Sequence, residues 1–283
     1  MVIIMIYNQV TKNNMEVSSM SILAGAVTAS KIPNDNVFVI YGPPGSGKTT
    51  LAATFPKSKE KPMLYIDVME GGAGVIPVKD REFVQIVTVN NYKELDEIFT
   101  DVMNGYTVDD TGKKIPVSFS TIVIDSLTQM EYLLKDYLKK ANNKEVMNLN
   151  LWGQVKDNNE YIFNMLRLLY NKTGSCIVSI CHEKEMMNEE NPQFNKLIPS
   201  LMTSSALSVC AKASYVFYCK IEEDTVIDPK TNESRTDMKY MTYIDAHPYL
   251  LTKCRKPKDF ACPAKVQNLT YDRFKKNVLD KIV

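Results

Sequence analysis

The 283-residue chain lacks the features that mark several common classes of protein. Its net charge is only +1, so no overall field favours nucleic acid or membrane, and an anionic partner must meet a local patch. No hydrophobic run is long enough to span a bilayer. The opening "MVIIMIY" is too short for a signal peptide and lacks a basic segment. We therefore expect a cytoplasmic protein with no membrane partner.

Paired cysteines and repeats are also missing. The six cysteines contain no CxxC pair, and Cys176 and Cys181 fall within or beside an apolar run typical of a buried strand. We expect small core residues in a reducing cytosol, not disulfides or zinc ligands. With 45% hydrophobic and 24% charged residues and no internal repeat, the composition is that of a globular protein with a substantial core.

Apolar runs alternate with amphipathic segments along most of the chain. Buried strands are predicted at 36–41, 63–68, 83–89, 119–126 and 175–183. Helices are predicted at 48–55, 91–105, 127–138 and 151–170, and the polar stretch 108–116 is predicted to be a loop. This alternation predicts an α/β fold, with a mostly parallel central sheet flanked by helices.

The pattern changes in the last third of the chain. The polar segment 183–196 is expected to be a mobile loop. Residues 214–223 and 239–246 alternate like an antiparallel hairpin, 249–257 is a further strand candidate, and Thr270 is placed to cap a final helix. We predict an amino-terminal arm at 1–35, with a role in oligomerisation, and one large domain at 36–283 whose region 258–283 is a basic helical end.

The stretch "IYGPPGSGKTT" joins a predicted strand to a predicted helix and matches G-x-x-x-x-G-K-[ST]. Glycines let the backbone wrap tightly and aim N–H groups inward, and because prolines cannot donate, the cradle must start at Gly45. The lysine supplies a charge to the β- and γ-phosphates. The residues predicted to bind a nucleotide are Gly42, Gly45, Ser46, Gly47, Lys48, Thr49 and Thr50.

A phosphate loop of this kind needs a metal and a group that acts on water. Thr49 offers a hydroxyl to Mg²⁺, and Asp125, at the end of "TIVID", is the predicted second metal-side residue. Glu70 is the first candidate to orient or deprotonate water, with Asp67 as the reserve. His182 ends another strand, where it can sense the γ-phosphate, because α/β sheets bind ligands at the carboxyl ends of their strands.

With these motifs, the chain resembles a RecA-like P-loop NTPase. "IVIDSLTQM" is similar to the metal-binding strand and following helix of RecA, and "LYID" with its glutamate resembles the strand carrying the catalytic glutamate. Here the glutamate comes three residues after Asp67, where that family usually has it two after. Over residues 36–258 the chain is most similar to phage-encoded RecA-like ATPases that act as single-strand annealing proteins.

The resemblance implies an active unit of several subunits. Lys253 and Arg255 in "TKCRKP" are similar to a K-x-R that, in RecA-like rings and filaments, reaches the γ-phosphate of the neighbouring subunit. On an extended strand the two side chains point to the same side, so both can enter one site. The resemblance therefore predicts catalytic roles for Lys253 and Arg255 beside Lys48, and self-association as a ring or filament.

By resemblance, the segment 183–200 takes the place of the main DNA-binding loop, where Phe194 and Lys196 can stack on a base and touch phosphate. The carboxyl-terminal region adds basic residues at Lys256, Lys258, Lys265, Arg273, Lys275, Lys276 and Lys281. The expected function is ATP-dependent single-stranded-DNA binding in recombination, by annealing or strand exchange. A single-stranded-DNA-binding protein is a further expected partner.

Two alternatives belong to other functional classes. A nucleotide-switched adaptor, such as a helicase loader, would bind protein. A loader of the AAA+ kind should carry a helical lid after the core, where this chain has a predicted hairpin and the K-x-R. A small-molecule kinase would need a lid rich in arginine, and "MNEENPQFNK" contains none.

Overall fold

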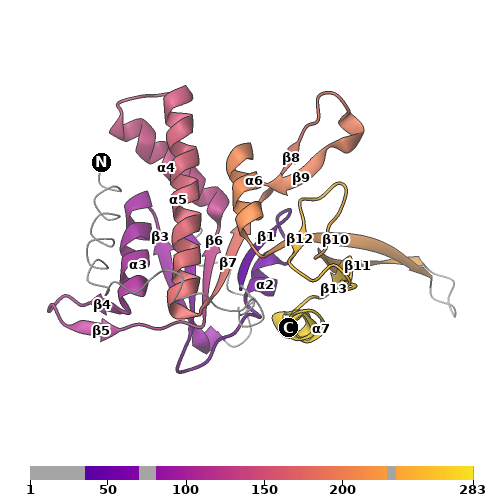
Figure 1. Cartoon of the computed structure of the whole chain (residues 1–283), viewed down its shortest axis with the longest axis horizontal. Coiled ribbons are helices and arrows are strands. Elements are labelled where there is room, and N and C mark those ends of the chain that lie inside the picture. The colour runs from indigo at the N-terminus through magenta and orange to yellow at the C-terminus, as the bar shows by residue number, and fades with distance from the viewer. Residues whose placement is uncertain (1–35, 70–80, 228–233, 283) are drawn as a thin grey trace, which may run out of the picture. The chain divides into compact units, whose positions relative to one another are not determined.

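A nine-stranded sheet forms the centre of the fold, which the computed structural model describes for residues 36–69, 81–227 and 234–282 (Figure 1). The strand order is β13–β11–β10–β1–β7–β6–β2–β3, and β12 also pairs with β10. The strands are β1 (Val37–Tyr41), β2 (Met63–Val68), β3 (Val84–Val89), β6 (Thr121–Asp125), β7 (Cys176–Cys181), β10 (Tyr215–Ile227), β11 (Ser234–Tyr243), β12 (Lys253–Cys254) and β13 (Lys265–Gln267).

Burial explains why the central strands are continuous apolar runs. All residues of β1, β2, β6 and β7 are buried, as expected for parallel strands covered on both faces. The pairs of β1 with β10 and β7, of β6 with β7 and β2, and of β2 with β3 are parallel. β11, β12 and β13 add an antiparallel end. The carboxyl ends of the parallel strands therefore meet at one edge of the sheet.

Helices flank this sheet, and local caps set where they begin. They are α2 (Lys48–Ala52), α3 (Tyr92–Asn104), α4 (Leu127–Ala141), α5 (Leu149–Thr173), α6 (Thr203–Lys212) and α7 (Tyr271–Asn277). Asn91 and Glu94 form a capping box on α3, and side chains of Ser126, Asn148 and Thr270 cap α4, α5 and α7. α3, α4 and α5 pack together, and α4 and α5 contact β7.

An aromatic cluster joins α7 to the sheet beside α2. The ring of Phe274 lies 5.1 Å from that of Tyr215 and 5.0 Å from that of Phe217, while Phe38 packs on Phe55 at 4.8 Å. Every one of these side chains is almost fully buried. The carboxyl-terminal helix is thus part of the core that supports β1.

The predicted fold class is confirmed, including the long antiparallel hairpin of β10 with β11 and the final helix. Two predicted loops are wrong in part. Residues 108–116 contribute to a hairpin of β4 (Tyr106–Val108) and β5 (Lys114–Pro116), and 183–196 to one of β8 (Glu183–Met186) and β9 (Lys196–Pro199). The β4–β5 hairpin is largely exposed, whereas β8 and β9 are mostly half-buried, with two buried residues at the end of β9. Neither hairpin carries the apolar alternation by which strands are recognised.

Other segments differ from the sequence prediction or add to it. α6 was not predicted, and the strand candidate at 249–257 reduces to the two residues of β12. The predicted arm at 1–35 lies outside the described residues. None of the helices in the described part of the chain combines the length and apolar composition that crossing a membrane requires.

Candidate functional site

The glycine loop lies at the carboxyl edge of the sheet, between the end of β1 and the start of α2. Gly42, Gly45 and Gly47 have φ angles of 151°, 75° and 85°. A Cβ atom on Gly42 would lie 2.1 Å from the backbone oxygen of Cys219, where β10 passes the loop. Because an L side chain fits neither this space nor this backbone conformation, the motif requires glycine there.

The Lys48 ammonium lies against the loop. Its Nζ donates to the carbonyl oxygens of Gly42 at 3.0 Å and Pro43 at 2.7 Å. An ammonium has three N–H groups, so these two bonds leave one for an anionic ligand. Burial lowers the pKa of Lys48, and the nearby Asp125 carboxylate opposes that shift. The structure therefore places a desolvated positive charge at the loop.

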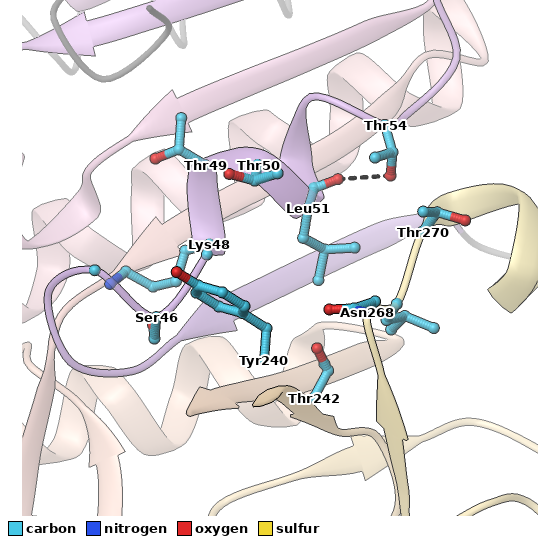
Figure 2. Close-up of a pocket in the computed structure, with 13 residues that line it drawn as sticks. Ser46, Lys48, Thr49, Thr50, Leu51, Thr54, Tyr240, Thr242, Asn268 and Thr270 are labelled. Atoms are coloured by element: carbon cyan, nitrogen blue, oxygen red, sulfur yellow. Dashed lines mark hydrogen bonds between the residues drawn. The ribbon is translucent and has the colours of Figure 1, made fainter. Parts of the chain in front are cut away.

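Backbone amides and one hydroxyl complete this environment, which Figure 2 shows from the side of the pocket. The Leu51 N–H donates to the Gly47 carbonyl at 2.9 Å, so the amides of Lys48, Thr49 and Thr50 precede the first intrahelical bond. The Ser46 hydroxyl is buried and has no hydrogen-bond partner among the described residues. A buried polar atom without a partner fits a site that receives phosphate oxygens.

The Thr49 hydroxyl donates to Asp125 Oδ2 at 2.9 Å, and the Tyr65 hydroxyl donates to the same oxygen. Asp125 is 7% exposed at the end of β6. Oxygen ligands of this kind suit Mg²⁺, which usually takes only one or two protein groups besides phosphate and water. In keeping with this, no three His, Cys, Asp or Glu side chains within the described ranges converge as a metal cage.

The structure brings His182 to the same place. His182 follows β7, the strand between β1 and β6, and its imidazole interacts electrostatically with Lys48 and Asp125. Burial and the Lys48 charge lower the pKa of His182, whereas Asp125 raises it. Burial and the Lys48 charge thus both disfavour the protonated form of this imidazole.

The two candidates for the catalytic carboxylate are placed differently. Asp67 is 1% exposed and lies in register with Asp125 on the neighbouring strand, so both side chains project from the same face of the sheet. Glu70, the first candidate, lies outside the described residues. Of the two candidates, the structure therefore gives a position for Asp67 only.

Lys253 and Arg255 do not join this group within one chain. The Lys253 ammonium donates to the carbonyls of Ala211 and Ala213 at 2.7 Å each, where α6 ends. The Arg255 N–H donates to Ser214 O at 3.0 Å, and the Ser214 N–H donates to Val37 O. Val37 lies five residues before Gly42 along β1, about 16 Å at the usual rise per residue. Arg255 is exposed and cannot reach its own phosphate loop.

A cavity of about 610 Å³ opens beside the loop and α2. Its far wall consists of Tyr240 and Thr242 on β11 and of residues 268–270 before α7 (Figure 2). Tyr240 is 46% exposed, and its Cδ1 would lie 3.3 Å from a Cβ on Gly47. Sequence reasoning missed these residues because almost 200 positions separate them from the loop. The only sequence feature that could have indicated this wall is Tyr240, an aromatic residue among the polar residues of the predicted hairpin.

The basic carboxyl-terminal residues are largely engaged within the chain. Lys256 pairs with Asp245 at 2.6 Å, Lys265 with Glu222 at 2.8 Å and Lys275 with Asp280 at 3.2 Å. Arg273 donates to the backbone oxygens of Gln267 and Asn268. The three ion pairs reduce the net positive charge that the region offers to a phosphate backbone.

Comparison with known proteins adds the following findings. A family model described as "AAA domain" matches residues 34–255, well over half of the chain. Curated proteins yield no match. Among solved structures, the flagellar accessory protein FlaH from Methanocaldococcus jannaschii is similar over 83% of this chain and 85% of its own, with 11% identity and a TM-score of 0.41. A likeness of this degree carries no inference about function.

We predict that Gly42→Ala loses nucleotide binding and at least about 2 kcal/mol of unfolding free energy, because the new methyl meets a backbone oxygen. Gly112→Ala is the matched control: Gly112 also has positive φ, but no atom lies within 4 Å of its Cβ position. That variant should lose only about 1 kcal/mol. Urea unfolding and titration with a fluorescent nucleotide measure both effects. Equal behaviour of the two variants would contradict the steric account.

Proposed function

The chain belongs to the AAA-domain family and is an ATPase, and from this premise we propose that it is an ATP-dependent single-stranded-DNA-binding protein of recombination. It would anneal strands or exchange them, as RecA-like proteins do. The observation that carries the proposal is the physical link between the phosphate loop and the β8–β9 hairpin, which follows β7 and His182.

That link consists of hydrogen bonds at both sides of the hairpin. The Tyr41 hydroxyl, one residue before Gly42, donates to the carbonyl of Leu197 on β9 at 2.9 Å. The His182 carbonyl accepts from the Ser200 N–H at 2.8 Å, just beyond β9. A change at the loop or at His182 would therefore displace the hairpin directly. This arrangement suits a protein in which ATP controls a binding surface.

We assign MgATP to the site. Lys48 and the loop amides would hold the phosphates, while Thr49 and Asp125 would hold the metal ion. Bound Mg²⁺ would supply charge neutralisation at the phosphates. His182 would sense the γ-phosphate, and Glu70 or Asp67 would orient the attacking water. The cavity lined by Tyr240 and Asn268 would take the nucleoside, with the base against the tyrosine ring.

We further propose that the active unit is an oligomer, a ring or a filament, in the cytoplasm. Arg255 would act at the phosphates of the neighbouring protomer, since it lies too far from its own. Lys253 would fix β12 beside α6 and so set the direction of Arg255. The arm at 1–35 would connect protomers, residues 36–283 would form the ATPase domain, and a single-stranded-DNA-binding protein would be a further partner.

We predict that single-stranded DNA raises the ATPase rate several-fold in the wild-type protein. Lys48→Ala should abolish both basal and stimulated rates, because the loop loses its only buried ammonium. Lys113→Ala, on the distant β4–β5 hairpin, is the control and should keep both. A rate that ignores DNA but rises with a replicative helicase would overturn the recombination role in favour of the loader role.

For the nucleoside cavity, we predict that Tyr240→Ala raises the Kd for MgATP at least about 5-fold through lost stacking. Tyr240→Phe keeps the ring and should stay near the wild-type value. Inorganic tripolyphosphate, which has no base, should bind Tyr240→Ala and wild type equally. If tripolyphosphate binding falls as much as ATP binding, the tyrosine supports the loop and does not contact a base.

Mixing two inactive variants tests the intersubunit role. Arg255→Ala and Lys48→Ala assemblies should each be inactive alone. In a random equal mixture of head-to-tail assemblies, about one quarter of the interfaces would combine an intact loop with an intact arginine. ATPase activity should therefore reappear at up to that fraction. Failure to recover any activity in assemblies shown to exchange subunits would refute action across the interface.

A further inference from the structure

A second cavity, of about 410 Å³, lies where α4 and the first turn of α5 meet β8 and the segment after β9. The lining residues that carry the argument are Glu131, Tyr132, Lys135, Trp152, Lys184 and Thr203. It is separate from the cavity beside the phosphate loop, with which it shares no lining residue. The roles proposed above do not use these side chains.

Two aromatic rings and an ammonium meet in this cavity. The Nζ atom of Lys135 lies 5.0 Å from the ring centroid of Trp152 and 5.1 Å from that of Tyr132. Tyr132 is 53% exposed, so much of its side chain is open to a ligand. The rings thus offer apolar faces to a flat ligand, while the cation lies close to both.

The charges favour an anionic ligand. Both oxygens of the buried Glu131 carboxylate are engaged: Oε2 accepts from Asn159 Nδ2 and the Met202 N–H, each at 2.8 Å, and Oε1 pairs with Lys135 at 2.6 Å. Lys135 therefore balances Glu131. Lys184, whose Nζ donates to Thr203 Oγ1 at 3.1 Å, adds a second ammonium. The cavity holds two cations against one carboxylate.

We propose that this cavity binds one nucleotide of single-stranded DNA, with its base against Tyr132 and Trp152 and its phosphate at Lys184. Grooves that bind single strands combine aromatic platforms with basic groups in this way. The inference rests on the function proposed above and locates its DNA contact. It moves that contact from Phe194 and Lys196, near the hairpin tip, to the base of the hairpin.

The position also connects the DNA site to the ATP site. Lys184 comes two residues after His182, and the Met202 amide that holds Glu131 comes two residues after Ser200, which bonds the His182 carbonyl. A displacement at His182 would move Lys184 and the Glu131 anchor together. Nucleotide binding at the loop would thereby tune DNA affinity at this cavity.

Trp152 is the only tryptophan of the chain, so its tryptophan emission reports on this cavity. The experiment titrates wild-type protein with a 20-nucleotide oligo-dT in the presence of Mg²⁺ and a non-hydrolysable ATP analogue. Excitation is at the red edge of tryptophan absorption, and fluorescence anisotropy of a labelled oligonucleotide measures binding in parallel. We expect saturable quenching of Trp152 that follows the anisotropy. An abasic oligonucleotide of the same length should bind less tightly and leave the emission unchanged.

Substitutions test the proposed DNA contact without relying on Trp152 fluorescence. Tyr132→Ala should weaken oligo-dT binding between about 5-fold and 150-fold, the range for one lost base stack. Lys184→Gln should weaken it and flatten its salt dependence. Tyr106→Ala is the matched control, because Lys114 lies 4.1 Å from that ring in the β4–β5 hairpin, which Figure 1 shows well away from β8 and β9. The control should bind like wild type.

The outcomes separate this site from the function on which it rests. One result would overturn the site alone: single-stranded DNA binds and stimulates ATP hydrolysis, but Trp152 fluorescence does not change and Tyr132→Ala binds DNA like wild type. Protein that hydrolyses ATP but gives no anisotropy change with any single strand would overturn both proposals. If oligo-dT quenches Trp152 in the wild-type protein but Lys184→Gln binds the oligonucleotide with wild-type affinity, the assigned phosphate contact would be overturned.

Discussion

The hydrogen bond between Thr49 and Asp125 joins the phosphate loop to a strand two positions away in the sheet. It exists only because β7 separates β1 from β6 in a fixed register, which aligns Tyr41 with Cys181 and Asp125 with Ile180. Continuous burial of these three strands holds that register. The Lys48 ammonium and the oxygens of Thr49 and Asp125 thus lie at one edge of the sheet because burial on both faces fixes the strand register.

In the proposed function, the same strand edge would carry a change at a bound phosphate to a distant surface. Tyr41 ends β1 and His182 directly follows the neighbouring strand β7, and each bonds the β8–β9 hairpin or its base. The hairpin is largely polar and half-buried, and the buried end of β9 and the backbone bonds of Leu197 to Tyr249 and Leu251 also hold it in place. The phosphate loop is therefore connected to a polar, well-anchored hairpin.

The features that the sequence predicted correctly are those that depend on neighbouring residues. The glycine loop, the strand ending at Asp125 and the cap at Asn91 each depend on a few adjacent residues, and each lies where predicted. Tyr65, Tyr240 and the Tyr132–Trp152 cavity depend on pairings between distant segments, which no local pattern encodes. Lys253 shows that a local pattern can also mislead. Its alternation with Arg255 is visible in the sequence, but its hydrogen bonds to the end of α6 depend on the tertiary structure.

The central claim is that Thr49 and Asp125 hold a metal-bound polyphosphate at the loop. Isothermal titration of ATP into wild-type protein and Asp125→Asn, with Mg²⁺ and with EDTA, tests it most directly. The account predicts that Mg²⁺ strengthens ATP binding to the wild type at least about 10-fold, and that Asp125→Asn keeps the weaker metal-free affinity but loses most of this gain. An undiminished magnesium effect in Asp125→Asn, or no affinity of the wild type for any nucleoside triphosphate, would contradict it.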